Sequence, residues 1–493
     1  MEPVVQTGRG RVRGVVSGGV AAFKGIPYAA APVGDLRFAA PAPVPAWDGV
    51  REATQYGPTA PKPPYRSPLD QLLPDPVIPG EDFLNLNVWT PDFAASLPVL
   101  VWIHGGAFVH GSSAVSLYDG SNFARDGLVF VSINYRLGAP GFALLEDAPA
   151  NRGLLDQVAA LQWVRDNIAA FGGNPDLVTI AGESAGAMSV LTLLAMPAAE
   201  GLFRRAIAQS GAGHAVMAAD TARRVAAALA ESLEVEPSRA GFASVTPEEL
   251  VGAQEALVER IRADPNPETW GESAADSRAF APCIDGEVLT ARPIDRIADG
   301  ASADVDVLIG TNTDEFTLFF VPFGVDGAID DNLLRMMIGV HGLDVDAALV
   351  AYRAARPDAT PGQLLMDVLR DRMFRIPALR VAEARWALDI PTYVYRFDWP
   401  TTEYDGRLGA THALEIGFVF DNLRVRESSA LAGPKPPQEL AERMHQAWVA
   451  FASTGRPGWS RYGDNRTEMT FGLDSGTTDD PDAELRALWD GIR

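Results

Sequence analysis

The chain has 493 residues, of which 47% are hydrophobic, so it is long enough to bury a large core. Its formal net charge of −23 would repel polyanions, which argues against a nucleic-acid partner and otherwise favours solubility. The single cysteine, Cys283, excludes an intramolecular disulfide and a cysteine-based zinc site, and its apolar neighbours indicate a packed, unreactive thiol.

The N-terminal residues 1–7 contain neither a basic region nor the apolar run of a signal peptide. No uncharged apolar stretch approaches the roughly 18–20 residues that a membrane span needs. We therefore expect a cytoplasmic protein without a membrane partner. Nothing in the sequence predicts an oligomer, and a monomer is the simplest expectation.

Apolar runs alternate with helix-like segments along much of the chain. Residues 156–171 have helical spacing, with Val158, Leu161, Val164 and Ile168 on one face. Continuous apolar runs, typical of buried strands, occur at 99–104, 128–134, 177–181, 203–209, 305–310 and 393–397. Buried strands separated by helices predict an α/β fold, with a mostly parallel sheet covered on both faces.

Three segments depart from this alternation. Residues 58–80 contain eight prolines, which indicates a long surface loop and not a linker between domains. Residues 221–263 and 330–387 are largely helical in pattern. We interpret them as helical insertions that cap the sheet and shape a pocket.

A Gly-x-Ser-x-Gly sequence occupies residues 182–186, with Ser184 at its centre. An apolar run precedes it and a helix-like run, 187–194, follows it, so the serine is expected at a sharp turn between a strand and a helix. This arrangement is typical of the nucleophile of serine hydrolases. The flanking glycines leave room for the strained turn, and the helix amino terminus directs N–H groups at a developing oxyanion.

A second glycine-rich stretch, 104–108, follows the strand expected at 99–104. Backbone of this kind brings N–H groups close to an oxyanion, so this stretch is a candidate partner of the serine turn.

A hydrolytic serine also needs a base and an acid that orients the base. Among the six histidines, His412 is the best placed, because it lies in a loop of small residues after a strand and follows the serine in the chain. The acid is expected between them, just after the strand at 305–310. Both Asp314 and Glu315 fit that position.

In these motifs and their order, the chain resembles the type B carboxylesterases, the family of cholinesterases, liver carboxylesterases and bacterial para-nitrobenzyl esterases. The likeness to the last group is the strongest. The segments that carry the resemblance are residues 23–29, 32–38, 81–88, 134–138, 151–157, 171–175 and 455–457.

The resemblance implies a single α/β-hydrolase domain over residues 1–493, with the insertions near 221–263 and 330–387. It implies that Glu315, not Asp314, is the acid, with His412 as the base, and that Ser210 lies beside them and hydrogen-bonds the acid. It also implies an oxyanion hole formed by the backbone N–H groups of Gly106, Ala107 and Ala185.

The chain departs from the family pattern at several positions. Phe83 stands where eukaryotic members have a disulfide-forming cysteine, which indicates a bacterial, cytosolic branch. Ala107 replaces the glycine of cholinesterases but is shared with para-nitrobenzyl esterases, and Ala413 stands where glycine is common. Residues 58–80 contain no tryptophan, so the choline-recognition loop has no counterpart and cholinesterase activity is not expected.

The resemblance therefore predicts a serine carboxylesterase acting on a small-molecule ester, with no metal and no organic cofactor. Aromatic residues near the motifs, expected to line an apolar acyl or aryl pocket, are Phe108, Phe319, Phe320, Phe374 and Phe420.

The residues present argue against two alternative functions. Adhesion proteins of this fold have lost the catalytic residues, whereas Ser184, Glu315 and His412 are all present. Hormone-sensitive-lipase-like enzymes share the His-Gly-Gly sequence but are shorter and use an aspartate.

Overall fold

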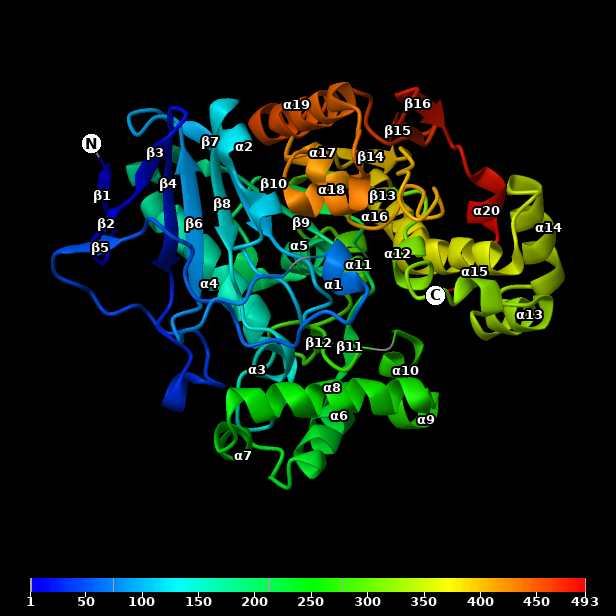
Figure 1. The fold of residues 1–493 in the computed structure, drawn as a ribbon, viewed down its shortest axis with the longest axis horizontal. Helices are drawn as coiled ribbons and strands as arrows, with labels where there is room; N and C mark the ends of the chain where they lie inside the picture. Colours follow the sequence, from blue (N-terminus) through cyan, green and yellow to red (C-terminus); the bar gives the residue numbers. More distant parts are fainter. Residues whose placement is uncertain (1, 74, 212, 277, 493) are drawn as a thin grey trace.

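A twisted sheet of 11 strands forms the centre of the computed structural model, which describes residues 2–73, 75–211, 213–276 and 278–492 (Figure 1). Its strands, in spatial order, are β16 (Gly476–Asp479), β15 (Thr467–Phe471), β14 (Thr392–Phe397), β13 (Asp306–Asn312), β10 (Arg205–Gln209), β9 (Gly173–Glu183), β7 (Leu97–Ile103), β8 (Val129–Ile133), β6 (Asn85–Thr90), β4 (Val20–Pro27) and β3 (Val15–Ser17). From β15 to β8 every neighbouring pair is parallel, and β16, β6, β4 and β3 pair antiparallel at the two edges. The prediction of a mostly parallel sheet is confirmed.

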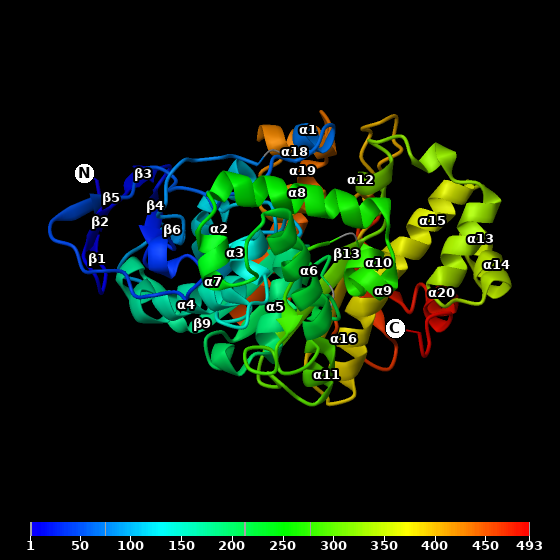
Figure 2. The same cartoon turned by 90° about the horizontal axis from the view of Figure 1, so that it is seen from below.

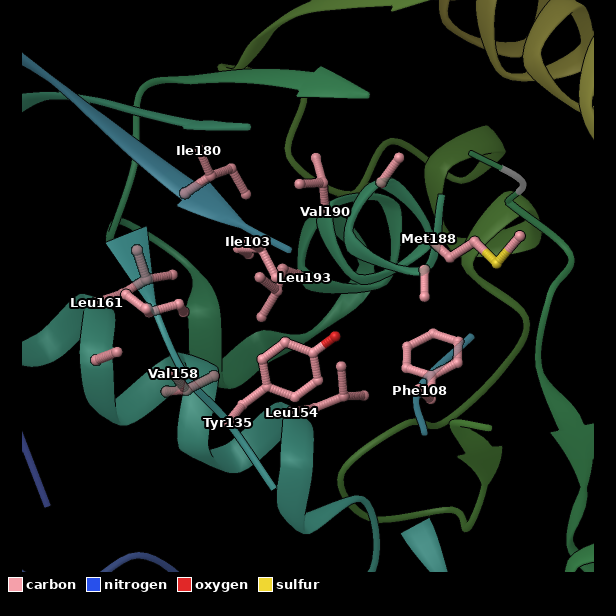
Figure 3. Close-up of a cluster of buried hydrophobic side chains, with 14 of the residues drawn as sticks. Ile103, Phe108, Tyr135, Leu154, Val158, Leu161, Ile180, Met188, Val190 and Leu193 are labelled. Atoms are coloured by element: carbon pink, nitrogen blue, oxygen red, sulfur yellow. The ribbon is translucent and has the colours of Figure 1, made fainter. Parts of the chain in front are cut away.

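Both faces of the sheet are covered by helices, as its alternating side chains require. In β7, Val101 and Ile103 belong to one hydrophobic cluster and Leu100 and Trp102 to another. The first cluster includes side chains of α4 (Arg152–Asn167) and α5 (Ala185–Ala195), which pack together in Figure 3. The second includes those of α2 (Ser121–Arg125) and α19 (Gln438–Thr454). Because both faces are apolar, the central strands read as continuous hydrophobic runs.

The segments expected to be helical insertions contain helices, which lie below the sheet for the first segment and mostly to its right for the second in the view of Figure 1, and which Figure 2 shows from below. The first holds α6 (Ala219–Ser232), α7 (Arg239–Ala243) and α8 (Pro247–Ala263), and α8 packs against α3 (Gly138–Phe142). The second holds α13 (Asp331–Val340), α14 (Val345–Ala355), α15 (Pro361–Arg370) and α16 (Ile376–Trp386), with a π-helical turn at Asp371–Arg375. Helices α13 to α15 and α20 (Ala483–Ala487) share a small hydrophobic core of their own, whereas α16 packs on the sheet.

The remaining elements are short. Small sheets are formed by β1 (Val4–Gln6), β2 (Arg11–Arg13) and β5 (Val50–Glu52), and by β11 (Met217–Ala218) and β12 (Cys283–Ile284). Further α-helices are α1 (Leu69–Leu72), α9 (Pro267–Trp270), α10 (Glu272–Asp276), α11 (Pro293–Ala298), α12 (Thr317–Phe320), α17 (Glu415–Val419) and α18 (Arg426–Ala432). Single 3-10 turns occur at Gly34–Leu36, Ser116–Tyr118, Ile168–Phe171, Pro197–Ala199 and Asp326–Ala328. Among the described helices, none has the length and the apolar run needed to cross a bilayer.

The proline-rich segment 58–80 is a loop with one short helix, but part of it is buried. Lys62 and Asp75 form an ion pair whose side chains are only 1% and 6% exposed. Both also bind Gly111, since Lys62 Nζ donates to its carbonyl and Asp75 accepts its N–H. The Tyr65 ring stacks on that of His110 at 4.2 Å. These contacts hold the segment over the residues that follow β7.

Candidate active site

Ser184 occupies the sharp turn between β9 and α5. Its backbone angles, φ 55° and ψ −123°, are strained for a residue with a side chain. A Cβ on Gly186 would lie 2.0 Å from the carbonyl oxygen of Ile103, and one on Gly182 would lie 2.5 Å from the carbonyl carbon of Gly186. Both glycines are therefore required for the turn to pack against β7.

The glycine-rich loop 104–108 lies directly against Ser184. A Cβ on Gly105 would be 3.2 Å from the Cβ of Ser184. Among the described residues, the N–H groups of Gly106 and Ala107 donate no hydrogen bond. Ala185 is the first residue of α5, so its N–H is also one of the donors that a helix leaves without an intrahelical partner. Three backbone donors are thus available at the serine.

His412 and Glu315 are in contact. The Nδ1 atom of His412 lies 2.5 Å from Oε2 of Glu315, and the two residues are 4% and 0% exposed. Glu315 Oε1 accepts the backbone N–H of Asn312 at 2.8 Å, which fixes the carboxylate. The neighbouring Asp314 instead accepts the N–H of Ala410 at 2.9 Å. Of the two acidic candidates, only Glu315 therefore reaches the imidazole.

Glu183, the residue before the serine, also faces the imidazole, and sequence reasoning missed it. Its Oε1 lies 3.0 Å from His412 Nε2, but the two atoms do not form a hydrogen bond. Burial raises the pKa of Glu183 to about 8. Burial also acts to lower the pKa of His412, but Glu183 and then Glu315 outweigh it and raise that pKa to about 9. A charged residue inside an otherwise apolar turn was the signal that could have revealed it.

A third buried carboxylate, Glu415, lies behind the site. It accepts hydrogen bonds from the side-chain amides of Gln209, at 3.0 Å, and Asn312, at 2.7 Å. Burial raises the pKa of Glu415. Ser210 does not fulfil its expected role: its Oγ is buried and has no hydrogen-bond partner among the described residues. Its left-handed backbone, φ 50°, directs its N–H to the carbonyl of Gly310 at 2.8 Å.

Other histidines have structural surroundings. His104 is buried against the ring of Tyr135, and burial lowers its pKa to about 4, so it is neutral. The His110 ring stacks on that of Tyr65 and not on the Glu315 carboxylate. His445 lies in α19, where its Nδ1 is 2.8 Å from the carbonyl oxygen of Val419. None of these three touches the carboxylates of the site.

A pocket of about 150 Å³ opens at Ser184 and His412. Its apolar wall comes from segments far apart in the chain, namely Leu69, Leu72 and Leu73 of the proline-rich segment, Phe319 of α12, Ile416 of α17 and Leu431 of α18. No sequence pattern indicated the contribution of residues 58–80, because it depends on the long-range contacts of Lys62, Asp75 and Tyr65.

The five phenylalanines expected in the pocket have different positions. Phe319 lines it, and the Phe374 ring lies 4.9 Å from that of His412. Phe108 is directed into the core (Figure 3), and its ring packs on that of Phe142. Phe420 packs on Trp102 and other rings of the opposite face, and Phe320 on Phe316. For Phe108, Phe320 and Phe420 the expectation was therefore wrong, since aromatic character does not reveal on which side of an element a ring lies.

Comparisons with known proteins identify the family of the chain. Residues 1–478 match the model of the carboxylesterase family. The chain is 39% identical to the para-nitrobenzyl esterase of Bacillus subtilis over 98% of its own length and 97% of that protein, and 38% identical to the phenmedipham hydrolase of Pseudarthrobacter oxydans over 92% and 90%. A solved carboxylesterase of Geobacillus stearothermophilus superposes with a TM-score of 0.86, at 39% identity, covering 99% of both chains. The chain therefore belongs to the carboxylesterase family and is a carboxylic ester hydrolase.

Proposed function

We propose that the protein is a serine carboxylesterase that hydrolyses esters of small to medium, largely apolar acyl or aryl groups through an acyl-enzyme. The observation that carries the proposal is the 2.5 Å contact of His412 with Glu315 beside the pocket that Ser184 also lines. A positioned base next to a strained serine is the arrangement that nucleophilic catalysis requires.

In the first half-reaction, Ser184 Oγ attacks the ester carbonyl carbon while His412 Nε2 takes its proton. Glu315 holds the Nδ1–H and stabilises the imidazolium. The oxyanion accepts hydrogen bonds from the N–H groups of Gly106, Ala107 and Ala185, each worth about 3 kcal/mol. The C–O bond of the ester then breaks, and the alcohol leaves with the proton from His412.

In the second half-reaction, His412 removes a proton from water, which attacks the acyl-enzyme carbonyl. The same three N–H groups hold the second oxyanion. The carboxylic acid leaves when the bond to Ser184 Oγ breaks, and the proton on His412 returns to that oxygen.

The size and polarity of the pocket support the substrate class. Its volume of about 150 Å³ is below the roughly 300–1,000 Å³ of pockets for drug-sized ligands. Its walls are mainly leucine, isoleucine, valine and aromatic side chains. The name of the Bacillus subtilis relative, a para-nitrobenzyl esterase, agrees with esters that carry an aromatic group.

The test is a rate series on p-nitrophenyl esters from acetate to palmitate, with Ser184→Ala and Ser189→Ala in parallel. Ser189 is a buried serine on the same helix α5 that does not line the pocket, so it controls for serine loss alone. We expect fast turnover of short and medium esters, a loss of about 10⁴–10⁶-fold in kcat for Ser184→Ala, and little change for Ser189→Ala. A peak at long chains would contradict the substrate class, and near-normal turnover by Ser184→Ala would contradict the nucleophile.

A further inference from the structure

The segment that follows β8 contacts the loop 104–108 at both of its ends. The hydroxyl of Tyr135 donates to the carbonyl oxygen of His104 at 2.9 Å. Three residues later, the N–H of Gly138 donates to the carbonyl oxygen of Phe108 at 2.8 Å. The proposed oxyanion donors, Gly106 and Ala107, lie between these two fixed points.

The loop needs such contacts because its backbone conformation is unfavourable. Gly106, Ala107 and Phe108 have φ values of +110°, +53° and +64° in succession. For the two residues with side chains, a left-handed conformation costs roughly 1–3 kcal/mol each and persists only where surrounding structure imposes it. The direction of the N–H groups is set by these same dihedral angles, so whatever imposes them also aims the donors.

Tyr135 is well placed to impose these backbone dihedral angles on the loop. Its ring is fully buried beside α4 and α5 (Figure 3). It stacks on the His104 ring, with centroids 4.5 Å apart. Burial raises the pKa of Tyr135, so the phenol remains a donor.

The segment around Tyr135 is itself held rigidly. Arg136 forms a bidentate ion pair with Asp156 of α4, with Nη2–Oδ1 at 2.7 Å and Nε–Oδ2 at 2.8 Å. Both side chains are almost completely buried. On the other side, Gln254 of α8 accepts the N–H of Ala139 at 2.6 Å. We call the segment 135–139, with its contacts to Asp156 and Gln254, the clamp. It links the positions of α4 and α8 to the loop 104–108.

We propose that Tyr135 is a positioning residue for ester hydrolysis, whose hydroxyl aims the oxyanion donors by holding the carbonyl of His104. The inference rests on the proposed function, in which Gly106 and Ala107 bind the oxyanion. It assigns to Tyr135 no contact with substrate.

Tyr135→Phe tests the inference, because it keeps the stacked ring and deletes only the hydroxyl. Displaced donors weaken the transition state more than the bound ester, so kcat is expected to fall about 10- to 100-fold while KM changes less than about twofold. A trifluoromethyl ketone, which forms a hemiketal oxyanion with Ser184, should lose affinity by a similar factor. The matching methyl ketone should bind Tyr135→Phe and the unchanged protein equally.

Tyr352→Phe is the matched control. The Tyr352 hydroxyl is equally buried and donates to Asp371 at 2.7 Å, but it lies in α14, within the separate core of α13 to α15. The variant Tyr352→Phe should lower the urea midpoint of denaturation, as Tyr135→Phe does, and should leave kcat unchanged.

The possible outcomes separate the two ideas. If Tyr135→Phe keeps full kcat and full affinity for the trifluoromethyl ketone, or if Tyr352→Phe loses kcat equally, the positioning role is wrong. If Ser184→Ala keeps its turnover, the proposed function itself fails. If Tyr135→Phe does not fold, Gln254→Leu is the second test, because it removes the side-chain oxygen that accepts the N–H of Ala139 in the clamp. That variant should then show the loss in kcat and in trifluoromethyl ketone affinity, and unchanged values would overturn the inference.

Discussion

The contact between Glu183 and His412 should determine how activity depends on pH. In the proposed mechanism His412 must be neutral to accept the proton of Ser184, so activity rises with pH through the pKa of His412. Because the buried carboxylates raise that pKa to about 9, the acid limb of kcat/KM should lie above the ordinary value of 6.5. Replacing the carboxylate in Glu183→Gln removes part of this effect. The pKa of His412 then falls, and the acid limb moves to lower pH.

The size of the shift follows from the distance. At 3.0 Å and an effective dielectric constant of about 20, Coulomb's law gives about 5.5 kcal/mol between an ionised Glu183 and a protonated His412, or about 4 pKa units. This is an upper limit, because the pKa of Glu183 is itself raised to about 8 and the carboxyl is partly protonated below that pH. We therefore expect a fall of about 1–2 units. A less basic imidazole should also lower the plateau of kcat/KM, by about 3- to 10-fold.

The assay measures kcat/KM for p-nitrophenyl butyrate as a function of pH. Absorbance is followed at the isosbestic wavelength, at which p-nitrophenol and its anion absorb equally. Glu427→Gln is the matched control, since this carboxylate lines the same pocket but does not contribute to the raised pKa of His412. Its limb should move much less. A limb that stays in place in Glu183→Gln, moves to higher pH, or moves equally in both variants would refute the reasoning.

Three further predictions concern the scaffold. Asp156→Asn breaks a buried bidentate ion pair and should lower the free energy of unfolding by about 3–5 kcal/mol. Asp220→Asn, at an exposed ion pair, should change it by less than about 1 kcal/mol. Equal losses for the two variants in urea denaturation would contradict this prediction. Gly186→Ala should abolish activity and impair folding, while Gly252→Ala, with open space around its Cβ in α8, should stabilise the protein by up to about 1 kcal/mol in the same assay. Cys283 is fully buried and burial raises its pKa to about 12, so a thiol reagent should modify it only after denaturation; rapid labelling of the native protein would show this to be wrong.

The sheet could be predicted because its central strands are buried on both faces. Residues 99–104 and 177–181 are continuous apolar runs for that reason, and both lie within or overlap strands of the sheet. Strand β4 gave no such signal. Its sequence includes a lysine, a glycine and a proline, and its register shifts between Phe23 and Ile26 where it pairs with β6. Its position at the antiparallel edge is set by its partners and not by its own residues.

The candidate site divides in the same way. Ser184 and the glycines beside it are predictable because the turn has local steric requirements that only certain residues meet. The wall formed by residues 58–80 is not, because a proline-rich segment has no periodicity and its position depends on a lysine and an aspartate that meet over Gly111. Likewise, nothing local indicates that Phe108, with φ +64°, turns its ring away from the pocket.

Glu183 and Tyr135 are proposed to act on different atoms of the same reaction. A double variant can show whether their effects are independent. In the proposed mechanism Glu183 acts on the proton held by His412, whereas Tyr135 acts on the loop proposed to bind the oxyanion. If so, the losses in kcat/KM of Glu183→Gln and Tyr135→Phe, converted to free energies, should add to within about 0.5 kcal/mol in the double variant. The structure also offers a route for coupling, because a Cβ on Gly105 would lie 2.9 Å from the Glu183 carboxylate, so that side chain borders the loop. A combined loss clearly smaller than the sum would mean that Glu183 also supports the loop, and that its effect on rate is not through charge alone.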